Sequence, residues 1–305
     1  SLRRRQRQMC IRDRFATEGQ TLWVSTLSHE KKLNSLLMAR KKRAQKLLEK
    51  FGDAWIIISS GKDDTNSDYL IGTHGLGTFL ILLTPNDLRV LINSLERSFV
   101  ENKPHIDHVD TYYGYREFRE KLYGYAKDLS GRHVLANFSS PETFYHASRI
   151  THGLFVELEY LSKKYEFSLT PAGRYVYMLR KTKTEEELAA LEESVRRTLE
   201  ILDRILDNSV IRPGVSERDI MAELYRESYS ISEPSFEPIV ASGLNTANPH
   251  HVSSPRKIRK DDIVYIDFGV RFLTMSADIT RVFVVGNPPS KVFDVYLSLI
   301  HIFEP

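Results

Sequence analysis

The sequence has little cysteine and no long apolar run. It contains one cysteine in 305 residues, which excludes an internal disulfide and a disulfide-stabilised secreted scaffold. The longest apolar stretches, Trp55 to Ile58 and Phe79 to Leu83, are far shorter than the ~20 residues that a membrane-spanning helix needs. Hydrophobic residues make up 41% and charged residues 27%, which excludes a disordered chain. We therefore expect a soluble, cytoplasmic protein with no membrane partner.

The positive charge of the chain comes from its first residues. The net charge is +3, but residues 1–14 contain six arginines and one aspartate, so the remainder carries −2. A basic arm of this kind is typical of nucleic-acid binding. Both ends of the chain have another explanation. One short inverted DNA element can encode Met9 to Asp13 in one direction and Leu297 to Ile302 in the other, and it resembles the transposon end used to prepare sequencing libraries.

We therefore expect residues 1–14 and 297–305 to be translated adapter, and we exclude them from reasoning about the fold. This expectation removes the single cysteine, Cys10, and the basic arm, so we predict no nucleic-acid partner. It also predicts that the natural protein continues past residue 296. Residues 15–37 are interpreted as a leader of uncertain origin, because Met38 is the first methionine after the adapter.

Residues 38–170 are predicted to form an α/β domain. Short runs rich in Ile, Leu and Val predict strands, and runs of strong helix formers predict helices that alternate with them. The expected strands are 55–59, 77–83, 88–92 and 133–137, and the expected helices are 38–50, 117–128 and 141–149. His105 and His108 lie in a charged segment, which we interpret as a surface loop.

A linker is predicted over residues 171–184, and a second domain over residues 185–296. Thr184 is expected to cap a long helix, because three glutamates follow it. Seven apolar residues of this helix recur every three or four positions and are interpreted as core. They are Leu188, Leu191, Val195, Leu199, Leu202, Ile205 and Leu206. Ser216 with Asp219 predicts the start of a second helix.

Two aspartates and a histidine are the candidate functional residues. Alternation along Ile263 to Val270 places Asp267 on the face opposite its apolar neighbours, and a second strand is expected from Asp278 to Val285. If these strands pair antiparallel, the two carboxylates lie close together and repel each other unless a cation lies between them. Carboxylate-rich sites suit divalent ions such as manganese. His250 or His251 can supply a proton or stabilise an oxyanion. The spacing alone also fits two solvated strand ends.

Several motifs of the second domain, over residues 183–296, resemble the pita-bread metallopeptidases, a superfamily that includes methionine aminopeptidases, Xaa-Pro aminopeptidases, prolidases and creatinase. In chain order these motifs are Ile211-Arg212-Pro213-Gly214 with Ser216-Glu217, Ser235 to Gly243, Asn245 with Pro249-His250, Asp267-Phe268-Gly269 and Asp278-Ile279-Thr280-Arg281. Residues 38–170 resemble, more loosely, the amino-terminal domain of creatinase and prolidase, with 68–72 as the best local match. The resemblance implies a creatinase-like α/β domain followed by the first half of a pita-bread catalytic domain.

By this resemblance, Asp267 and Asp278 are metal ligands, with Asp278 bridging two divalent ions, and Thr280 orients a ligand. His250 is the catalytic residue that contacts the substrate, and His251 is the weaker candidate. Manganese is the first choice of metal, and cobalt, zinc and iron are alternatives. The implied enzyme is a dinuclear Xaa-Pro aminopeptidase or prolidase, a homodimer that cleaves peptides with proline at the second position.

The chain departs from the family pattern in two ways. A His-x-x-Gly-His-x-x-Gly motif and two later glutamates complete the family's five protein ligands, and none of them occurs in these 305 residues. We therefore expect this fragment to be inactive and poorly folded. Residues 271–276 also differ from the usual Gly-Tyr-containing connection. Two alternatives stay open: a metal-free creatinase-like hydrolase, and a non-catalytic pita-bread protein that binds partners. Such relatives usually lack the aspartates that are present here.

Overall fold

The computed structural model describes residues 28–61, 64–73, 75, 77–141, 148–287 and 290–303. The chain divides into two compact units between Glu186 and Glu187. The expected adapter at residues 1–14 lies outside the described residues. Within the described part of the chain, no helix combines the length and the apolar character needed to cross a membrane.

The first unit is built on a six-stranded mixed sheet with the strand order β4-β3-β2-β1-β5-β6. Its strands are β1 (Ala54–Ser60), β2 (Thr78–Leu83), β3 (Leu88–Asn93), β4 (His108–Tyr112), β5 (His133–Ala136) and β6 (Ser168–Pro171). β2 pairs antiparallel with β1 and β3, and the other neighbours pair parallel. A short 3-10 helix, η1 (Ser94–Phe99), follows β3. This sheet confirms the predicted α/β class.

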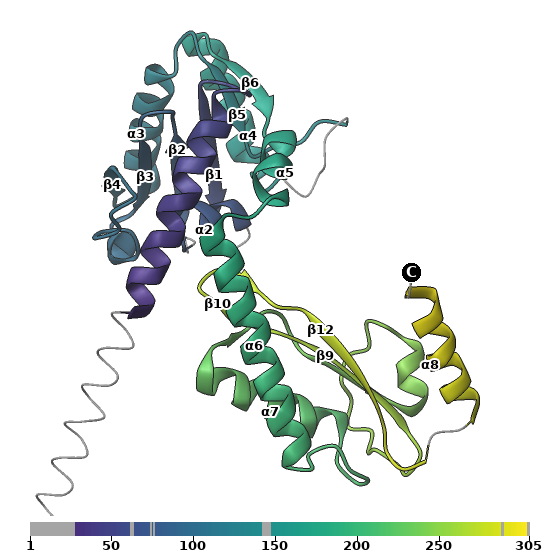
Figure 1. Ribbon diagram of the computed structural model, residues 1–305. Helices are drawn as coiled ribbons and strands as arrows, with labels where there is room; N and C mark the ends of the chain where they lie inside the picture. The colour runs from purple at the N-terminus through teal and green to yellow at the C-terminus, as the bar shows by residue number, and fades with distance from the viewer. Residues whose placement is uncertain are drawn as a thin grey trace, which may run out of the picture. The chain divides into compact units, whose positions relative to one another are not determined.

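Helices cover both faces of this sheet, because consecutive residues of the central strand β1 are apolar and therefore point to both faces. Trp55 and Ile57 pack in one core with the helix over residues 28–48 and with α2 (Thr65–Ile71) and α5 (Gly173–Lys181). Ile56 and Ile58 pack in a second core with α3 (Tyr115–Asp128) and α4 (His152–Tyr165). In Figure 1 the purple helix over residues 28–48 runs across the sheet in front of its strands.

The helix expected over residues 38–50 is already helical at residue 28, the first described residue, and ends at 48. Leu36 and Leu37 are fully buried in it. The helix expected over 141–149 falls mostly on residues 142–147, which lie outside the described residues.

The expected linker at residues 171–184 was wrong, because this segment contains α5. Tyr175 and Leu179 of α5 are fully buried in the first unit. Pro171 and Gly173 mark the end of β6 and the start of α5 and do not mark a linker. The surface-loop interpretation of His105 was also wrong, because this side chain is fully buried.

The second unit packs two long helices against two small antiparallel sheets. The helices are α6 (Glu185–Asp207) and α7 (Glu217–Ile231). One sheet has the order β12-β9-β8, with β8 (Ile239–Ser242), β9 (Ile263–Phe268) and β12 (Ile279–Val284); the other has the order β11-β10-β7, with β7 (Glu233–Pro234), β10 (Val270–Phe272) and β11 (Met275–Ser276). A 3-10 helix, η3 (Gly243–Ala247), follows β8, and α8 (Ser290–Phe303) ends the described chain. The adapter origin of residues 297–305 stays a prediction.

The core of the second unit lies on one face of β9. Val264, Ile266 and Phe268 are buried with apolar side chains of α6 and α7, as the alternation predicted. Tyr265 and Asp267 therefore lie on the opposite face. The predicted strand over residues 263–270 is interrupted after Phe268, because β10 pairs with a different sheet.

The buried face of α6 differs from the predicted apolar stripe. Four residues of that stripe are between 37% and 48% exposed: Leu188, Val195, Leu199 and Leu206. Small hydroxyl residues face the sheet instead. The backbone N–H of Phe272 donates to Oγ of Ser194 (3.0 Å), and that of Val270 donates to Oγ1 of Thr198 (3.1 Å). Ser194 and Thr198 thus supply hydrogen-bond acceptors to β10, while Leu202 and Ile205 of the predicted stripe are buried in the core.

Candidate functional site

Asp267 and Asp278 lie at one end of the β9–β12 pair. Phe268 of β9 is opposite Ile279 of β12, so Asp278, which directly precedes β12, continues the strand beside Asp267. Burial raises the pKa of Asp278 above its ordinary value, and the neighbouring Asp267 carboxylate raises it further. The structure therefore brings these two carboxylates together, as antiparallel pairing predicted.

Gly269 permits this close approach. A Cβ atom at this position would lie 1.9 Å from the carbonyl oxygen of Ala277 and 3.1 Å from the backbone nitrogen of Asp278. Any other residue would push the backbone before Asp278 away from β9. The glycine of the Asp-Phe-Gly motif is thus part of the geometry of the carboxylate pair.

Thr280 holds one of the two carboxylates in place. It lies directly opposite Asp267 in the strand register, and its Oγ1 donates to Oδ1 of Asp267 at 2.9 Å. Among the described residues, no group of three or more His, Cys, Asp or Glu side chains is close enough to hold a metal ion. The two aspartates are thus a carboxylate pair without a third ligand in this part of the chain.

His250 lies on the loop between η3 and β9 and is exposed. Its backbone N–H donates to Oδ1 of Asn248 at 3.0 Å. The hydroxyl oxygen of Tyr265 lies 2.8 Å from the carbonyl oxygen of Asn248 and 2.9 Å from that of Pro249, and donates to them. Tyr265 and Asp267 lie two residues apart on one strand face, about 7 Å along the strand. The strand that carries Asp267 therefore also anchors the loop that carries His250.

Glu217 accepts the most hydrogen bonds around this loop, although its sequence motif indicates only a helix connection. It is the first residue of α7, after the N-cap Ser216, and is fully buried. Its carboxylate accepts six hydrogen bonds. Oε1 accepts from the backbone N (2.7 Å) and Oγ (2.7 Å) of Ser242 and from Nδ2 of Asn245 (2.9 Å); Oε2 accepts from Nε2 of His251 (2.8 Å) and from the backbone N (3.0 Å) and Oγ (2.6 Å) of Ser254.

These hydrogen bonds decide the charge of Glu217. Burial alone would raise the pKa, but the donors, with Ser254 and Asn245 contributing most, lower it to about 2. The carboxylate is therefore ionised at neutral pH and can only accept hydrogen bonds. It follows that Nε2 of His251 carries a proton. No local sequence pattern indicates this arrangement, because the donors lie 25 to 37 residues further along the chain.

A second ion pair supports the start of the same loop. Arg256 donates from Nη1 and Nη2 to the two carboxylate oxygens of Asp262 at 2.8 and 3.0 Å, and from Nη1 to Oγ of Ser242 at 2.6 Å. Gly243 has a φ of +53°, and a Cβ atom there would lie 2.3 Å from Nη2 of Arg256. The loop thus packs closely around two charged groups, the Glu217 carboxylate and the Arg256 guanidinium.

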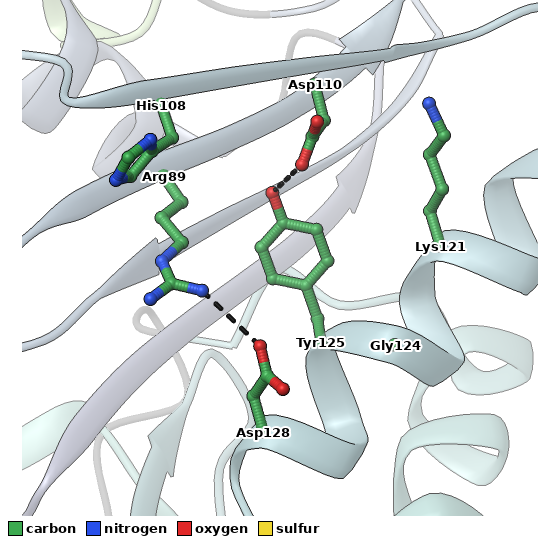
Figure 2. A pocket seen from close by; sticks show the side chains of 7 residues that line it. All are labelled: Arg89, His108, Asp110, Lys121, Gly124, Tyr125 and Asp128. Carbon is green, nitrogen blue, oxygen red and sulfur yellow. Dashed lines mark hydrogen bonds and ion pairs between the residues drawn. The ribbon is translucent and has the colours of Figure 1, made fainter.

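A cavity of about 510 Å³ lies in the first unit, next to α3. It is lined by Arg89, His108, Asp110, Lys121, Gly124, Tyr125 and Asp128 (Figure 2). The Tyr125 hydroxyl donates to Asp110 at 2.7 Å, and Arg89 pairs with Asp128 at 3.4 Å. Four of the lining side chains thus pair with one another, whereas the second unit holds the two adjacent carboxylates, so we place the candidate site there.

The comparisons with known proteins point to the same unit. The sequence profile of metallopeptidase family M24 matches residues 189–302, which include the carboxylate pair, the His250 loop and Glu217. We refer to residues 189–302 as the M24 domain because they match this family. This finding confirms the pita-bread resemblance on which the aspartates and His250 were selected.

Relatives of the M24 domain are known in sequence and in structure. A Xaa-Pro dipeptidase of Pyrococcus horikoshii is 27% identical over 235 residues, which cover 76% of this chain and 60% of the relative. The crystal structure of a dipeptidase from the same organism superposes with a TM-score of 0.68 at 28% identity, over 84% of this chain and 68% of the other. An X-Pro aminopeptidase structure from Thermotoga maritima gives a TM-score of 0.70 at 23% identity, over 85% of this chain and 69% of the other, which supports the two-domain α/β fold.

The chain spans about half the length of the curated relatives that it matches.

Proposed function

We propose that the M24 domain is part of a dinuclear, metal-dependent peptidase that hydrolyses the bond between an amino-terminal residue and a following proline. The observation that carries this proposal is the carboxylate pair of Asp267 and Asp278 on paired strands inside the M24 match. The substrate class is supported by relatives that are a Xaa-Pro dipeptidase and an X-Pro aminopeptidase. Peptides with proline at the second position are the proposed substrates.

Asp267 and Asp278 fit divalent cations as two of the ligands. Two adjacent carboxylates repel each other, and this repulsion adds to burial in raising the pKa of Asp278. Oxygen donors of this kind suit manganese, our first choice, and cobalt, zinc and iron are alternatives. Bound ions of this type lower the pKa of a coordinated water and polarise a carbonyl group. Thr280 keeps the Asp267 carboxylate oriented by its hydrogen bond.

His250 is the proposed catalytic residue. Its side chain is exposed, while its backbone is held by Asn248 and, through the neighbouring carbonyl groups, by Tyr265. An imidazole N–H in this position can donate to the oxyanion that develops when the peptide carbonyl is attacked. The bonds from Tyr265, which shares a strand face with Asp267, support a position of this loop near the carboxylate pair.

We also propose that these 305 residues alone are inactive. They supply two of the five protein ligands that the family resemblance implies, so we expect weak metal binding and no peptidase turnover. For the whole protein we propose a cytoplasmic homodimer, which the near absence of cysteine and the family resemblance support.

The test is to read the source gene past the codon for Tyr296 and to assay the protein that it encodes. We expect a His-x-x-Gly-His-x-x-Gly motif, two later glutamates, and Mn²⁺-dependent cleavage of an Xaa-Pro dipeptide over the matched Xaa-Ala dipeptide. Asp267→Asn and Asp278→Asn should each lower kcat at least about a thousandfold, and Asp203→Asn, an exposed control on α6, should not. Activity that resists chelators would favour the metal-free alternative. A continuing frame without these ligands would favour partner binding.

A further inference from the structure

Glu217 connects the two ends of one loop through a single carboxylate. Oε1 accepts only from the start of the loop, at Ser242 and Asn245, and Oε2 accepts only from its end, at His251 and Ser254. A carboxylate is the one side-chain group that offers two acceptor oxygens and no donor. Glutamine would turn one of these oxygens into an NH₂ group that faces donors. Residues 242–254 can therefore be closed in this form only with glutamate or an equivalent acid.

The same carboxylate restrains the residue next to His250. His251 is bonded through Nε2 to Glu217, and its side chain is only 15% exposed. On the other side of His250, the carbonyl groups of Asn248 and Pro249 are bonded to Tyr265. His250 itself is thus an exposed side chain between two anchored points, one on α7 and one on β9.

We propose that Glu217 is a positioning residue, which fixes the loop of residues 242–254 and thereby holds His250 relative to the carboxylate pair of Asp267 and Asp278. His251 transmits this restraint and is fixed as the Nε2–H form of the ring. The role of His250 in this inference rests on the proposed function. The role of Glu217 in holding the loop rests on the geometry alone.

The first part of the test measures amide hydrogen exchange at Ser242 and Ser254 in the 305-residue chain. In Glu217→Gln, whichever way the amide turns, one of these backbone N–H groups loses its acceptor. We expect exchange at Ser242 or Ser254 to become at least about tenfold faster, the effect of one lost hydrogen bond to a charged acceptor. The matched control is Glu223→Gln on the same helix, which removes only the pair with Arg226 and should leave both amides unchanged.

The second part asks whether the loop positions His250. Mn²⁺ added to the chain broadens nearby proton resonances, and we expect it to broaden the His250 ring signals in the native chain. In Glu217→Gln this broadening should fall at least about threefold, because freeing one end of the loop lets residues 248–251 move, while the broadening at Thr280 stays the same. If Glu217 only stabilised the fold, Glu217→Gln would lower the stability but would change the broadening at His250 and at Thr280 to the same extent.

Several outcomes would overturn the inference. Native exchange rates at both amides in a folded Glu217→Gln chain would show that the carboxylate does not hold the loop. Unchanged broadening at His250 would show that the loop does not position it.

If Glu217→Gln fails to fold, His251→Leu is the second variant. It removes one donor and leaves the carboxylate, and unchanged exchange at Ser254 in that variant would contradict the inference. Absence of Mn²⁺ broadening in the native chain would count against the proposed function, while the exchange result would still decide the role of Glu217.

Discussion

The two units each bury a titratable side chain, and they treat it in opposite ways. In the first unit His105 is fully buried, and neither ring nitrogen has a hydrogen-bond partner among the residues that the structure describes. Burial, with the nearby charges of Lys103 and Lys41, lowers its pKa to about 4. In the second unit Glu217 is equally buried but accepts six hydrogen bonds, and its pKa is lowered to about 2. The histidine is kept neutral and the glutamate is kept charged.

The difference lies in the hydrogen-bond donors that meet each buried group. A neutral buried histidine in the turn before β4 behaves as a packing residue. A charged buried glutamate has a desolvation cost that only a complete set of donors can offset. Those donors come from the loop that carries His250, next to the strand that carries Asp267. The charge of Glu217 is therefore linked to the order of the candidate site.

The largest expected effect is that of Glu217→Leu. It leaves the donors of Ser242, Asn245, His251 and Ser254 without their acceptor, so we expect the free energy of unfolding to fall by about 3–5 kcal/mol. Urea unfolding followed by circular dichroism measures this change. Loss of less than about 1 kcal/mol would show that water replaces the carboxylate without difficulty.

Acid should destabilise the first unit through His105. The unfolded chain binds a proton near pH 6.5, but the folded chain resists protonation until about pH 4. The unfolded state therefore holds more protons in this range, and unfolding becomes easier as pH falls from 6.5 to 4, by up to about 3 kcal/mol. The measure is the difference between the native chain and His105→Leu across this range. Parallel pH profiles for the two proteins would contradict the burial of a neutral histidine.

Glu217 should make a contribution in a lower pH range. Its carboxyl group has an ordinary pKa of 4.5 and a folded pKa of about 2, so its stabilising effect is present above pH 4.5 and is lost as pH falls toward 2. The difference in unfolding free energy between the native chain and Glu217→Gln from pH 4.5 to 2 isolates this effect, because other carboxyl groups with a lowered pKa, such as Glu193, titrate in both proteins. A difference that stays constant over that range would contradict the six hydrogen bonds.

A smaller effect is expected for Gly269→Ala. The new Cβ atom would overlap the carbonyl oxygen of Ala277, so we expect a loss of about 2–3 kcal/mol and a wider separation of Asp267 and Asp278. The control is Gly124→Ala in α3, where no atom lies within 4 Å of the new Cβ and a gain of about 0.5–1 kcal/mol is expected. Equal effects in the two variants would show that the close approach at Gly269 is not required.

The smallest expected effect is that of His105→Leu at pH 7. Replacing a buried polar ring that lacks hydrogen bonds by an apolar side chain should change the free energy of unfolding by less than about 1 kcal/mol. A loss above 2 kcal/mol in urea unfolding would show that the His105 ring makes a stabilising polar interaction.

The sequence predicted the parts of the site that depend on local pattern. The alternation of Val264, Ile266 and Phe268 placed Asp267 on the outer face of β9, and antiparallel pairing brought Asp278 beside it. Ser216 with Asp219 predicted the start of α7, where both form a capping box.

The parts that failed depend on contacts between distant residues. The stripe on α6 was right for Leu202 and Ile205 and wrong for its exposed residues, because Ser194 and Thr198 meet the backbone of β10, about 75 residues further along the chain. The burial of His105 has no local signal, because charged residues surround it in the sequence. The role of Glu217 was missed because its donors come together only when the loop closes onto α7.

The most direct test of the carboxylate pair is a titration of the 305-residue chain with Mn²⁺, with the free ion followed by electron paramagnetic resonance. We predict that the native chain and Asp203→Asn remove the same amount of free Mn²⁺, and that Asp267→Asn and Asp278→Asn each remove little. Equal binding by all four proteins would contradict a cation site at Asp267 and Asp278.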